Sequence, residues 1–332
     1  MSKKILFLLS KDSLNDATEY YIDILKDSFI QSGFVVDISH RVKDAREYMY
    51  ILTIEAKWFF FAKLANRHAK IMNWFQGVVA EEAFMTTNSM LRKGLWHFFE
   101  AFTLYFSEMN IYVSESMKRY FEKKYKISSK SFFIMPCFNK ELNIGLVDES
   151  KYNIPSFVYA GSMAKWQCVE EMICLYSEIE KEIPNSSLII LTKEIDMAEK
   201  LINQYGLKNY QIKYVSLEKL DEELRKYKYG FLLRDNHVVN NVATPTKMNS
   251  YLAARIIPIY TDVIDDFCVS FDHAKKFVRL KDIERKNWCE QIVNYEKNFN
   301  CMVLAEYEKS VEDIFLSYYS KDFYIKKLRD LI

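Results

Sequence analysis

Short apolar runs alternate along this chain with longer segments whose hydrophobic residues recur at helical spacing. In the first half the runs predict strands at 4–10, 34–39, 50–54, 70–76 and 110–114, with a weaker sixth at 131–136. The segments between them predict helices, for example over 17–32, 91–107 and 115–125. Strands that alternate with helices are typical of α/β proteins with parallel sheets. We therefore expect a doubly wound sheet in the first half.

The same alternation restarts after residues 136–155, a polar stretch with a proline at each end. Strands are expected at 157–161, 187–192, 211–216, 229–234, 256–260 and 276–280. Helices are expected over 168–182, 196–205, 218–227 and 245–254, with more toward the C-terminus. A polar stretch bounded by prolines is typical of a domain linker, here 137–155. The sequence thus predicts two doubly wound, Rossmann-like α/β domains, 1–140 and 151–302, with C-terminal helices of about 303–332 packing back on the first.

The composition narrows the class of protein. The 332 residues include 46 basic and 45 acidic side chains, and this net charge of +1 gives no support to nucleic-acid binding. The six cysteines form no C-x-x-C pair and the five histidines are scattered, so neither a zinc site nor a disulfide framework is expected. The early apolar run ILFLL fits a buried strand better than a signal peptide. No stretch approaches the roughly 18 apolar residues of a membrane span, and we expect a cytoplasmic protein.

Two loops of the second half are expected to converge. In the strand order 3-2-1-4-5-6, strands 1 and 4 are neighbours, and ligands bind in the crevice outside their carboxyl ends. Strand 157–161 is the first strand of this half and strand 229–234 is the fourth. The loop 161–167 and the segment that leads to the helix at 245 should therefore meet at one crevice.

The start of that helix has the chemistry of an anion site. Thr244 is a suitable N-cap and Pro245 a suitable first helical residue, which leaves the amides of Thr246 and Lys247 free to point outward. Such a helix start attracts phosphate through unpaired N–H groups and the positive end of the helix dipole. Taken singly, the same motif also fits an ordinary helix start.

Residues of both loops would complete a diphosphate site. Arg234 could grip an oxyanion with two hydrogen bonds, and Lys247 adds a second full charge. Gly161 and Ser162 allow close backbone approach, and Lys165 is a candidate third cation. Lys165 beside Trp166 also fits a plain turn with a half-buried indole.

Several nucleotide-binding motifs are missing from the sequence. There is no G-x-G-x-x-G and no G-x-x-x-x-G-K-[ST], so neither a dinucleotide-binding Rossmann protein nor a P-loop nucleotidase is indicated. No D-x-D follows a strand, and VIDDF at 263–267 is only a weak acidic pair. Because the helix start and the basic residues can offset the diphosphate charge, no metal is expected.

The segments FVYAGSMAKWQ at 157–167 and RDNHVVNNVATPTKMNSYLAARIIPIYTD at 234–262 resemble the donor half of bacterial glycosyltransferases of family 4, which have the GT-B fold. NWFQGVVAEEAF at 73–84 resembles a first-domain loop of capsule and lipopolysaccharide sugar transferases. The resemblance implies two Rossmann-like domains that face a cleft. It also implies a UDP- or GDP-linked sugar donor in the second domain and a glycan, lipid-linked or protein-linked acceptor facing the first. Transfer would retain the anomeric configuration and serve surface polysaccharide or glycoconjugate synthesis.

The resemblance also assigns residues to roles. Arg234 and Lys247 would bind the donor and stabilise the departing diphosphate during catalysis. The further donor-binding residues are Gly161, Ser162, Lys165, Trp166, Asn241, Thr244, Thr246 and Ser250. Gln76 and Gly77 lie on the acceptor side. Glu82 or Glu81 would orient the acceptor hydroxyl or act as its base, although both also fit surface loop carboxylates.

The sequence departs from the family pattern at three places. Ser250 replaces a glutamate that contacts the donor ribose, Arg255 replaces a glycine, and the loop at 10–16 lacks the usual glycines. A non-catalytic, transferase-like partner protein is therefore an alternative, as is a nucleotide-sugar epimerase of the same fold.

Two segments rich in aromatic and basic residues, 56–70 and 91–106, predict helices that lean on a membrane surface. Core packing explains the same pattern. The first interpretation predicts a peripheral protein at the inner face of the cell membrane.

Overall fold

The computed structural model describes residues 3–11, 16–129, 131–142 and 148–332. The chain divides into two compact units, each described by itself. Unit 1 comprises Met1–Asn139, Asn241–Thr244 and Ser320–Ile332, and unit 2 comprises Lys140–Asn240 and Pro245–Tyr319. Parts of the glycine-free loop at 10–16 and of the expected linker at 137–155 lie outside the described residues.

Unit 1 contains a six-stranded parallel sheet in the order β2-β1-β3-β4-β5-β6. Its strands are β1 (Lys3–Leu8), β2 (Phe34–Ser39), β3 (Tyr50–Thr53), β4 (Lys70–Phe75), β5 (Met109–Tyr112) and β6 (Phe132–Ile134). All six strands predicted for this half are confirmed. The residues of β4 and β5 are almost all buried, as expected for a parallel sheet with helices on both faces.

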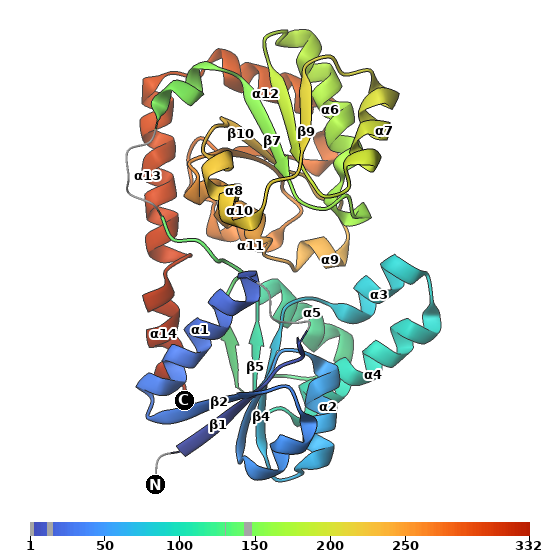
Figure 1. The fold of residues 1–332 in the computed structure, drawn as a ribbon, viewed down its shortest axis with the longest axis vertical. Helices are drawn as coiled ribbons and strands as arrows, with labels where there is room; N and C mark the ends of the chain where they lie inside the picture. The colour runs from blue at the N-terminus through green and yellow to red at the C-terminus, as the bar shows by residue number, and fades with distance from the viewer. Residues whose placement is uncertain (1–2, 12–15, 130, 143–147) are drawn as a thin grey trace. The chain divides into compact units, whose positions relative to one another are not determined.

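The helices of unit 1 are α1 (Asp16–Gln31), α2 (Ala56–Ala65), α3 (Val79–Thr87), α4 (Met90–Phe106), α5 (Glu115–Tyr125) and α14 (Lys321–Arg329), with the 3-10 helix η2 (Val42–Glu47). α14 packs against α1, and α4 packs against both α2 and α3 (Figure 1). The prediction of a loop over 73–84 is wrong for its second half, because α3 begins at Val79 and carries Glu81 and Glu82 in its first turn. Val78 at the N-cap position has no side-chain acceptor, so the usual sequence signal of a helix start is missing.

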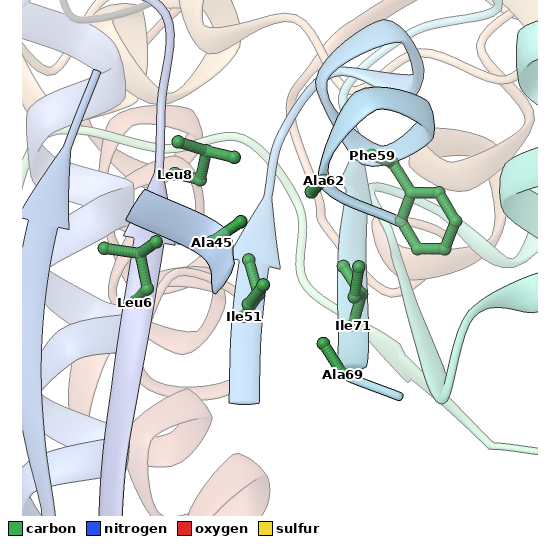
Figure 2. Packing of buried hydrophobic residues seen from close by; sticks show 8 residues of the cluster. All are labelled: Leu6, Leu8, Ala45, Ile51, Phe59, Ala62, Ala69 and Ile71. Carbon is green, nitrogen blue, oxygen red and sulfur yellow. The ribbon is translucent and has the colours of Figure 1, made fainter. Parts of the chain in front are cut away.

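One apolar cluster fixes α2 on the sheet of unit 1. Figure 2 shows Leu6 of β1, Ile51 of β3 and Ile71 of β4 in this cluster together with Phe59 of α2. The remaining members are Leu8, Ala45, Ala62 and Ala69. Small alanine side chains let the helix backbone approach the strands closely, which holds α2 in place.

Unit 2 contains a second six-stranded parallel sheet in the order β12-β11-β10-β7-β8-β9. Its strands are β7 (Ser156–Ala160), β8 (Ser187–Leu191), β9 (Tyr210–Lys213), β10 (Tyr229–Leu232), β11 (Ile257–Thr261) and β12 (Val278–Leu280). Numbered within the unit, this is the predicted order 3-2-1-4-5-6, read from the other edge. The prediction of two doubly wound α/β sheets is therefore confirmed.

The helices of unit 2 are α6 (Val169–Glu182), α7 (Ile195–Tyr205), α8 (Leu217–Leu224), α10 (Thr246–Ala253), α11 (Asp265–Ser270), α12 (Trp288–Lys297) and α13 (Cys301–Ser317), and α9 (Val238–Asn241) ends at the unit boundary. Three 3-10 helices are η3 (Glu149–Asn153), η4 (Lys165–Gln167) and η5 (Asp282–Asn287). Of the C-terminal segment expected to return to the first domain, α13 belongs to unit 2 and α14 to unit 1. Among the described residues, no helix combines the length and the apolar character needed to cross a bilayer.

The pairing of β7 with β10 positions the candidate site. Phe157 is the register partner of Tyr229, and the two strands run parallel. The loops that follow both strands therefore leave the sheet at the same edge. This is the predicted switch point of the sheet.

Candidate functional site

The helix that follows β10 begins one residue later than predicted. α10 starts at Thr246, and Pro245 occupies the N-cap position without a side-chain hydrogen bond. The first bond of the helix runs from the Met248 N–H to the Pro245 carbonyl (3.1 Å), so the amides of Thr246 and Lys247 precede it. The prediction that Thr244 caps this helix is wrong. Its hydroxyl instead accepts a hydrogen bond from the amide of Cys137 within unit 1 (2.9 Å).

In the part of the chain that the structure describes, neutral groups alone contact the ammonium group of Lys247. Its Nζ donates to Oε1 of Gln167 (3.0 Å) and lies 3.8 Å from the ring centroid of Tyr159. A carbonyl oxygen and an aromatic face both favour a cation, but neither neutralises it. Gln167 and Tyr159 were not among the predicted site residues, although both belong to the segment 157–167 that the sequence singled out.

Arg234 lies at the same end of the sheet, two residues beyond β10. Its backbone N–H donates to the Thr261 hydroxyl, which in turn donates to the Arg234 carbonyl (2.9 Å each). Its guanidinium donates to the carbonyl of Leu233 (2.8 Å), and the residue is only 4% exposed. The sequence places Arg234 at the crevice where the two loops meet, but in the structure its side chain is buried within unit 2.

These two cations lack a negative partner. Among the residues that the structure describes, neither Arg234 nor Lys247 forms an ion pair. Burial lowers the pKa of Arg234. Burial and the neighbouring charge of Arg234 together hold the pKa of Lys247 well below its usual value. A buried charge without a counterion is destabilising, so this pair is complementary to an anion with several oxygens.

Gly161 brings the β7 loop against the lysine. Its φ of +150° is rare for a residue with a side chain. A Cβ at this position would lie 3.0 Å from Nζ of Lys247 and 3.3 Å from the hydroxyl of Tyr159. That hydroxyl donates to the carbonyl of Ser162 (2.5 Å), which fixes the turn. Gly161 and Ser162 are both exposed, so a ligand can reach the loop backbone.

The other predicted donor-binding residues do not belong to the contacts that hold Arg234 and Lys247. Lys165 and Trp166 lie on the turn η4, where Lys165 is exposed and Gln167 makes the contact with Lys247. Ser250 lies on α10 and is half-buried. Asn241 and Thr244 group with unit 1 and are not part of the cation pair in unit 2.

Arg255, which stands where the resemblance has a glycine, adopts a backbone conformation that favours glycine. Its φ of +55° lies in the left-handed region, where a non-glycine residue costs about 1–2 kcal/mol. The side chain is buried and reaches the carboxylate of Glu312 on α13 (3.5 Å). The hydroxyl of Tyr152 donates to the Arg255 carbonyl (2.7 Å). This departure therefore serves packing between α10 and α13.

In unit 1 the adjacent carboxylates of Glu81 and Glu82 have different environments. Glu81 pairs with Lys93 (2.7 Å) and Lys124 (3.2 Å) and accepts a hydrogen bond from the Tyr120 hydroxyl (2.9 Å). Burial alone would raise the pKa of Glu81, but these three donors outweigh it and lower the pKa to about 2. Glu81 thus links α3, α4 and α5, and a group so strongly held in its ionised form is a poor base.

Glu82 has the opposite environment. Its Oε1 accepts a hydrogen bond from the amide of Val78 (3.1 Å). Burial raises the pKa of Glu82, the Val78 amide opposes that rise, and the charge of Glu100 adds to it. A Cβ at Gly77 would lie 2.1 Å from Oε1, so any other residue at this position would displace the carboxylate. A raised pKa is the property that a catalytic carboxyl base needs.

Glu82 lines a cavity of about 410 Å³ within unit 1. The lining residues are Ile54, Glu55, Ala56, Phe75, Gln76, Gly77, Val79, Glu82, Trp96 and Glu100. Nε2 of Gln76 is buried there without a hydrogen-bond partner among the described residues. An aromatic wall with carboxylate and amide groups suits a polar ring that carries hydroxyls. The alternative that Glu81 and Glu82 are surface loop carboxylates is wrong, since both are partly buried on a helix.

The sequence matches no protein-family model and no curated protein. The fold, in contrast, matches solved structures. It is similar to Alr3699/HepE of Anabaena in complex with UDP-glucose (TM-score 0.73, 12% identity, 98% of each chain). It is also similar to sucrose-phosphate synthase of Thermosynechococcus elongatus (TM-score 0.69, 10% identity, 100% of this chain and 98% of that one). A third similar structure is S. aureus TarM in complex with UDP and glycan ligands (TM-score 0.65, 13% identity, 85% of this chain and 55% of that one).

These neighbours define the class of fold. The chain spans about half the length of TarM and nearly the whole length of the other two. At identities this low the likeness shows a shared fold, and that fold is the GT-B fold expected from the sequence.

Proposed function

We propose that this protein is a glycosyltransferase that transfers a sugar from a nucleoside-diphosphate donor to a hydroxyl group. The observation that carries the proposal is the pair formed by the buried Arg234 and the half-buried Lys247, which has no counterion among the described residues. A diphosphate supplies the charge that the pair lacks. The structural neighbours support this assignment, because HepE binds UDP-glucose and TarM binds UDP.

The donor site would act on the leaving group. During transfer the bond between the anomeric carbon and the β-phosphate oxygen breaks, and its electron pair goes to the phosphate. Arg234, Lys247 and the first amides of α10 stabilise the negative charge that grows there. Because fixed cations already offset this charge, we propose that transfer does not require a metal ion.

The acceptor would bind in the cavity of unit 1. Its hydroxyl oxygen forms the new bond to the anomeric carbon, and its proton passes to the departing diphosphate. This sequence keeps the anomeric configuration and needs no separate base. Glu82 orients the hydroxyl through its carboxylate, and Trp96 provides an apolar wall for the sugar ring. The acceptor class that we propose is a glycan, free or carried on a lipid or protein, in surface polysaccharide or glycoconjugate synthesis.

Calorimetry with UDP and GDP, each with and without a chelator, tests the donor site. We expect binding that survives chelation and that falls about 10- to 150-fold in Lys247→Met, since a charge-assisted contact contributes about 1.5–3 kcal/mol. Lys297→Met, an exposed lysine at the end of α12, is the matched control and should bind normally. Binding that disappears on chelation, or that Lys247→Met leaves unchanged, would refute this site.

Transfer is measured separately with radiolabelled nucleotide sugars and a panel of glycan acceptors. Label in the acceptor, or slow release of free sugar without one, is the expected result. Donor binding without either product would identify a non-catalytic protein of the same fold and contradict the proposed activity.

A further inference from the structure

Exposed apolar side chains gather on α2 and α4 of unit 1, two helices that pack against each other. We call this set the α2–α4 face, and it consists of Phe61, Leu64, Leu91, Leu95, Phe98, Tyr105 and Phe106. Its members range from 39% exposed at Phe61 to 88% at Leu91. On α4 the residues Leu91, Leu95 and Phe98 recur at intervals of four and three, which places them on one stripe of the helix.

The aromatic rings beneath this face form a supported layer. Phe60 contacts Phe98 (centroids 5.5 Å apart) and Phe102 (5.0 Å), and Phe102 contacts Phe106 (4.5 Å). The exposed rings thus rest on partly buried neighbours. Such an extended apolar surface indicates an interaction site rather than scattered surface hydrophobics.

The charges on the two helices have one sign. α2 and α4 carry the basic residues Lys57, Lys63, Arg92 and Lys93. Their single acidic residue, Glu100, is 0% exposed. Lys57 and Arg92 are exposed and form no ion pair among the described residues. The face therefore presents an apolar stripe with cations beside it, and the exposed carboxylate of Glu108, two residues beyond α4, is paired with Lys70 (3.3 Å).

This combination favours one occupant. Lysine is depleted at protein–protein interfaces, whereas leucine and aromatic residues flanked by lysine and arginine are typical of helices that lie at a lipid surface. We propose that the α2–α4 face binds peripherally to an anionic phospholipid bilayer. Its apolar side chains enter the boundary between headgroups and acyl chains, and Lys57 and Arg92 stay beside the lipid phosphates. The inference goes beyond sugar transfer and holds whether or not transfer occurs.

Co-sedimentation of the full chain with vesicles tests this proposal. The probes are vesicles of equal parts phosphatidylglycerol and phosphatidylcholine, and vesicles of phosphatidylcholine alone. We expect the protein to sediment with the anionic vesicles and to be released by salt. Leu91→Asp with Phe98→Asp should lower the partition coefficient at least tenfold. Leu316→Asp, on α13 of unit 2 at 76% exposure, is the matched control and should bind like the wild type.

A second pair of variants isolates the charge. Lys57→Glu with Arg92→Glu should lower partition into anionic vesicles roughly thirtyfold or more. Lys219→Glu with Lys297→Glu reverses two exposed lysines of unit 2 and should have little effect. All variants change exposed side chains, so their melting temperatures and UDP affinities serve as checks on folding.

Three results would overturn the proposal. The first is failure of the wild type to sediment with anionic vesicles, and the second is equal loss in the control variants. The third is dimerisation in the ultracentrifuge without lipid that Leu91→Asp abolishes, since it would identify the face as an interface between two copies. If the protein binds UDP but does not sediment with vesicles, the lipid site is refuted and the proposed donor site is not.

Discussion

Replacing Lys247 by methionine should stabilise the unliganded protein while it weakens nucleotide binding. Methionine keeps a similar length and can still contact the ring of Tyr159, with which Lys247 Nζ now forms a cation–π contact. The substitution removes a charge that is partly buried beside Arg234 and has no counterion among the described residues. A structural lysine would show the opposite result, because its loss would cost stability.

The magnitude follows from the contacts of the lysine. The lost hydrogen bond to Gln167 and the lost cation–π contact together contribute roughly 2–3 kcal/mol. An uncompensated buried charge costs about 3–5 kcal/mol. The net gain is therefore about 1–2 kcal/mol, or a melting temperature roughly 2–8 °C higher.

Urea denaturation with and without UDP measures both effects. The lowered pKa of Lys247 means that the folded wild type carries the full cost of the charge at low pH. That cost is relieved as the pH rises from the folded pKa toward the ordinary lysine value, so the advantage of Lys247→Met should shrink over that interval. A variant that is less stable than the wild type and binds UDP normally would refute this account of the site.

Four further predictions concern other groups in the two units. Glu81→Gln should lower the free energy of unfolding by roughly 1–3 kcal/mol at neutral pH, and this difference should vanish as the pH falls from about 4.5 to the lowered pKa of about 2. Glu82→Gln should leave the free energy of unfolding unchanged and slow sugar transfer. Chemical denaturation measures the first effect and turnover measures the second. Equal changes in Glu81→Gln and Glu82→Gln in these two measurements would contradict the prediction. Gly161→Ala should displace Nζ of Lys247 and weaken UDP binding at least fivefold in calorimetry, and unchanged affinity would show that the loop does not constrain the lysine. Lys151 is 7% exposed, and burial, followed by the charge of Arg255, lowers its pKa to about 7. The free energy of unfolding of the wild type should therefore rise from pH 7 toward pH 10 relative to that of Lys151→Met. Parallel curves of unfolding free energy against pH, measured by urea titration, would argue against the lowered pKa.

The sequence predicted the topology better than the details of the site. Periodicity located every strand that the described residues form, and the switch-point rule then placed Arg234 and Lys247 at the same sheet edge. Burial of Arg234 was not predictable, because it depends on how Thr261 holds the backbone beyond β10. The contact between Lys247 and Gln167 depends on the path of a turn for which residue spacing gives no rule.

Helix starts were the weakest part of the prediction. α3 begins after Val78 and α10 after Pro245, and neither N-cap position has a side chain that bonds to the helix. Local capping signals therefore misplaced one helix and missed the other, because tertiary packing determines where both begin. The different fates of Glu81 and Glu82 also depend on packing, since only α4 and α5 supply the cations that neutralise Glu81.

Helix α4 contributes residues to the cavity on one side and to the exposed apolar stripe on the other. Trp96 and Glu100, which line the cavity, are turned roughly 140–180° from Leu91, given about 100° of rotation per residue. The cavity and the stripe of α4 that we propose to bind lipid are therefore separated by the thickness of one helix, about 10 Å. For an acceptor anchored in the bilayer, this distance would limit which of its sugars can enter the cavity. Sugars next to the lipid would reach it, and sugars far along an extended chain would not. The protein would then act early in the growth of a lipid-borne glycan rather than at its distal end.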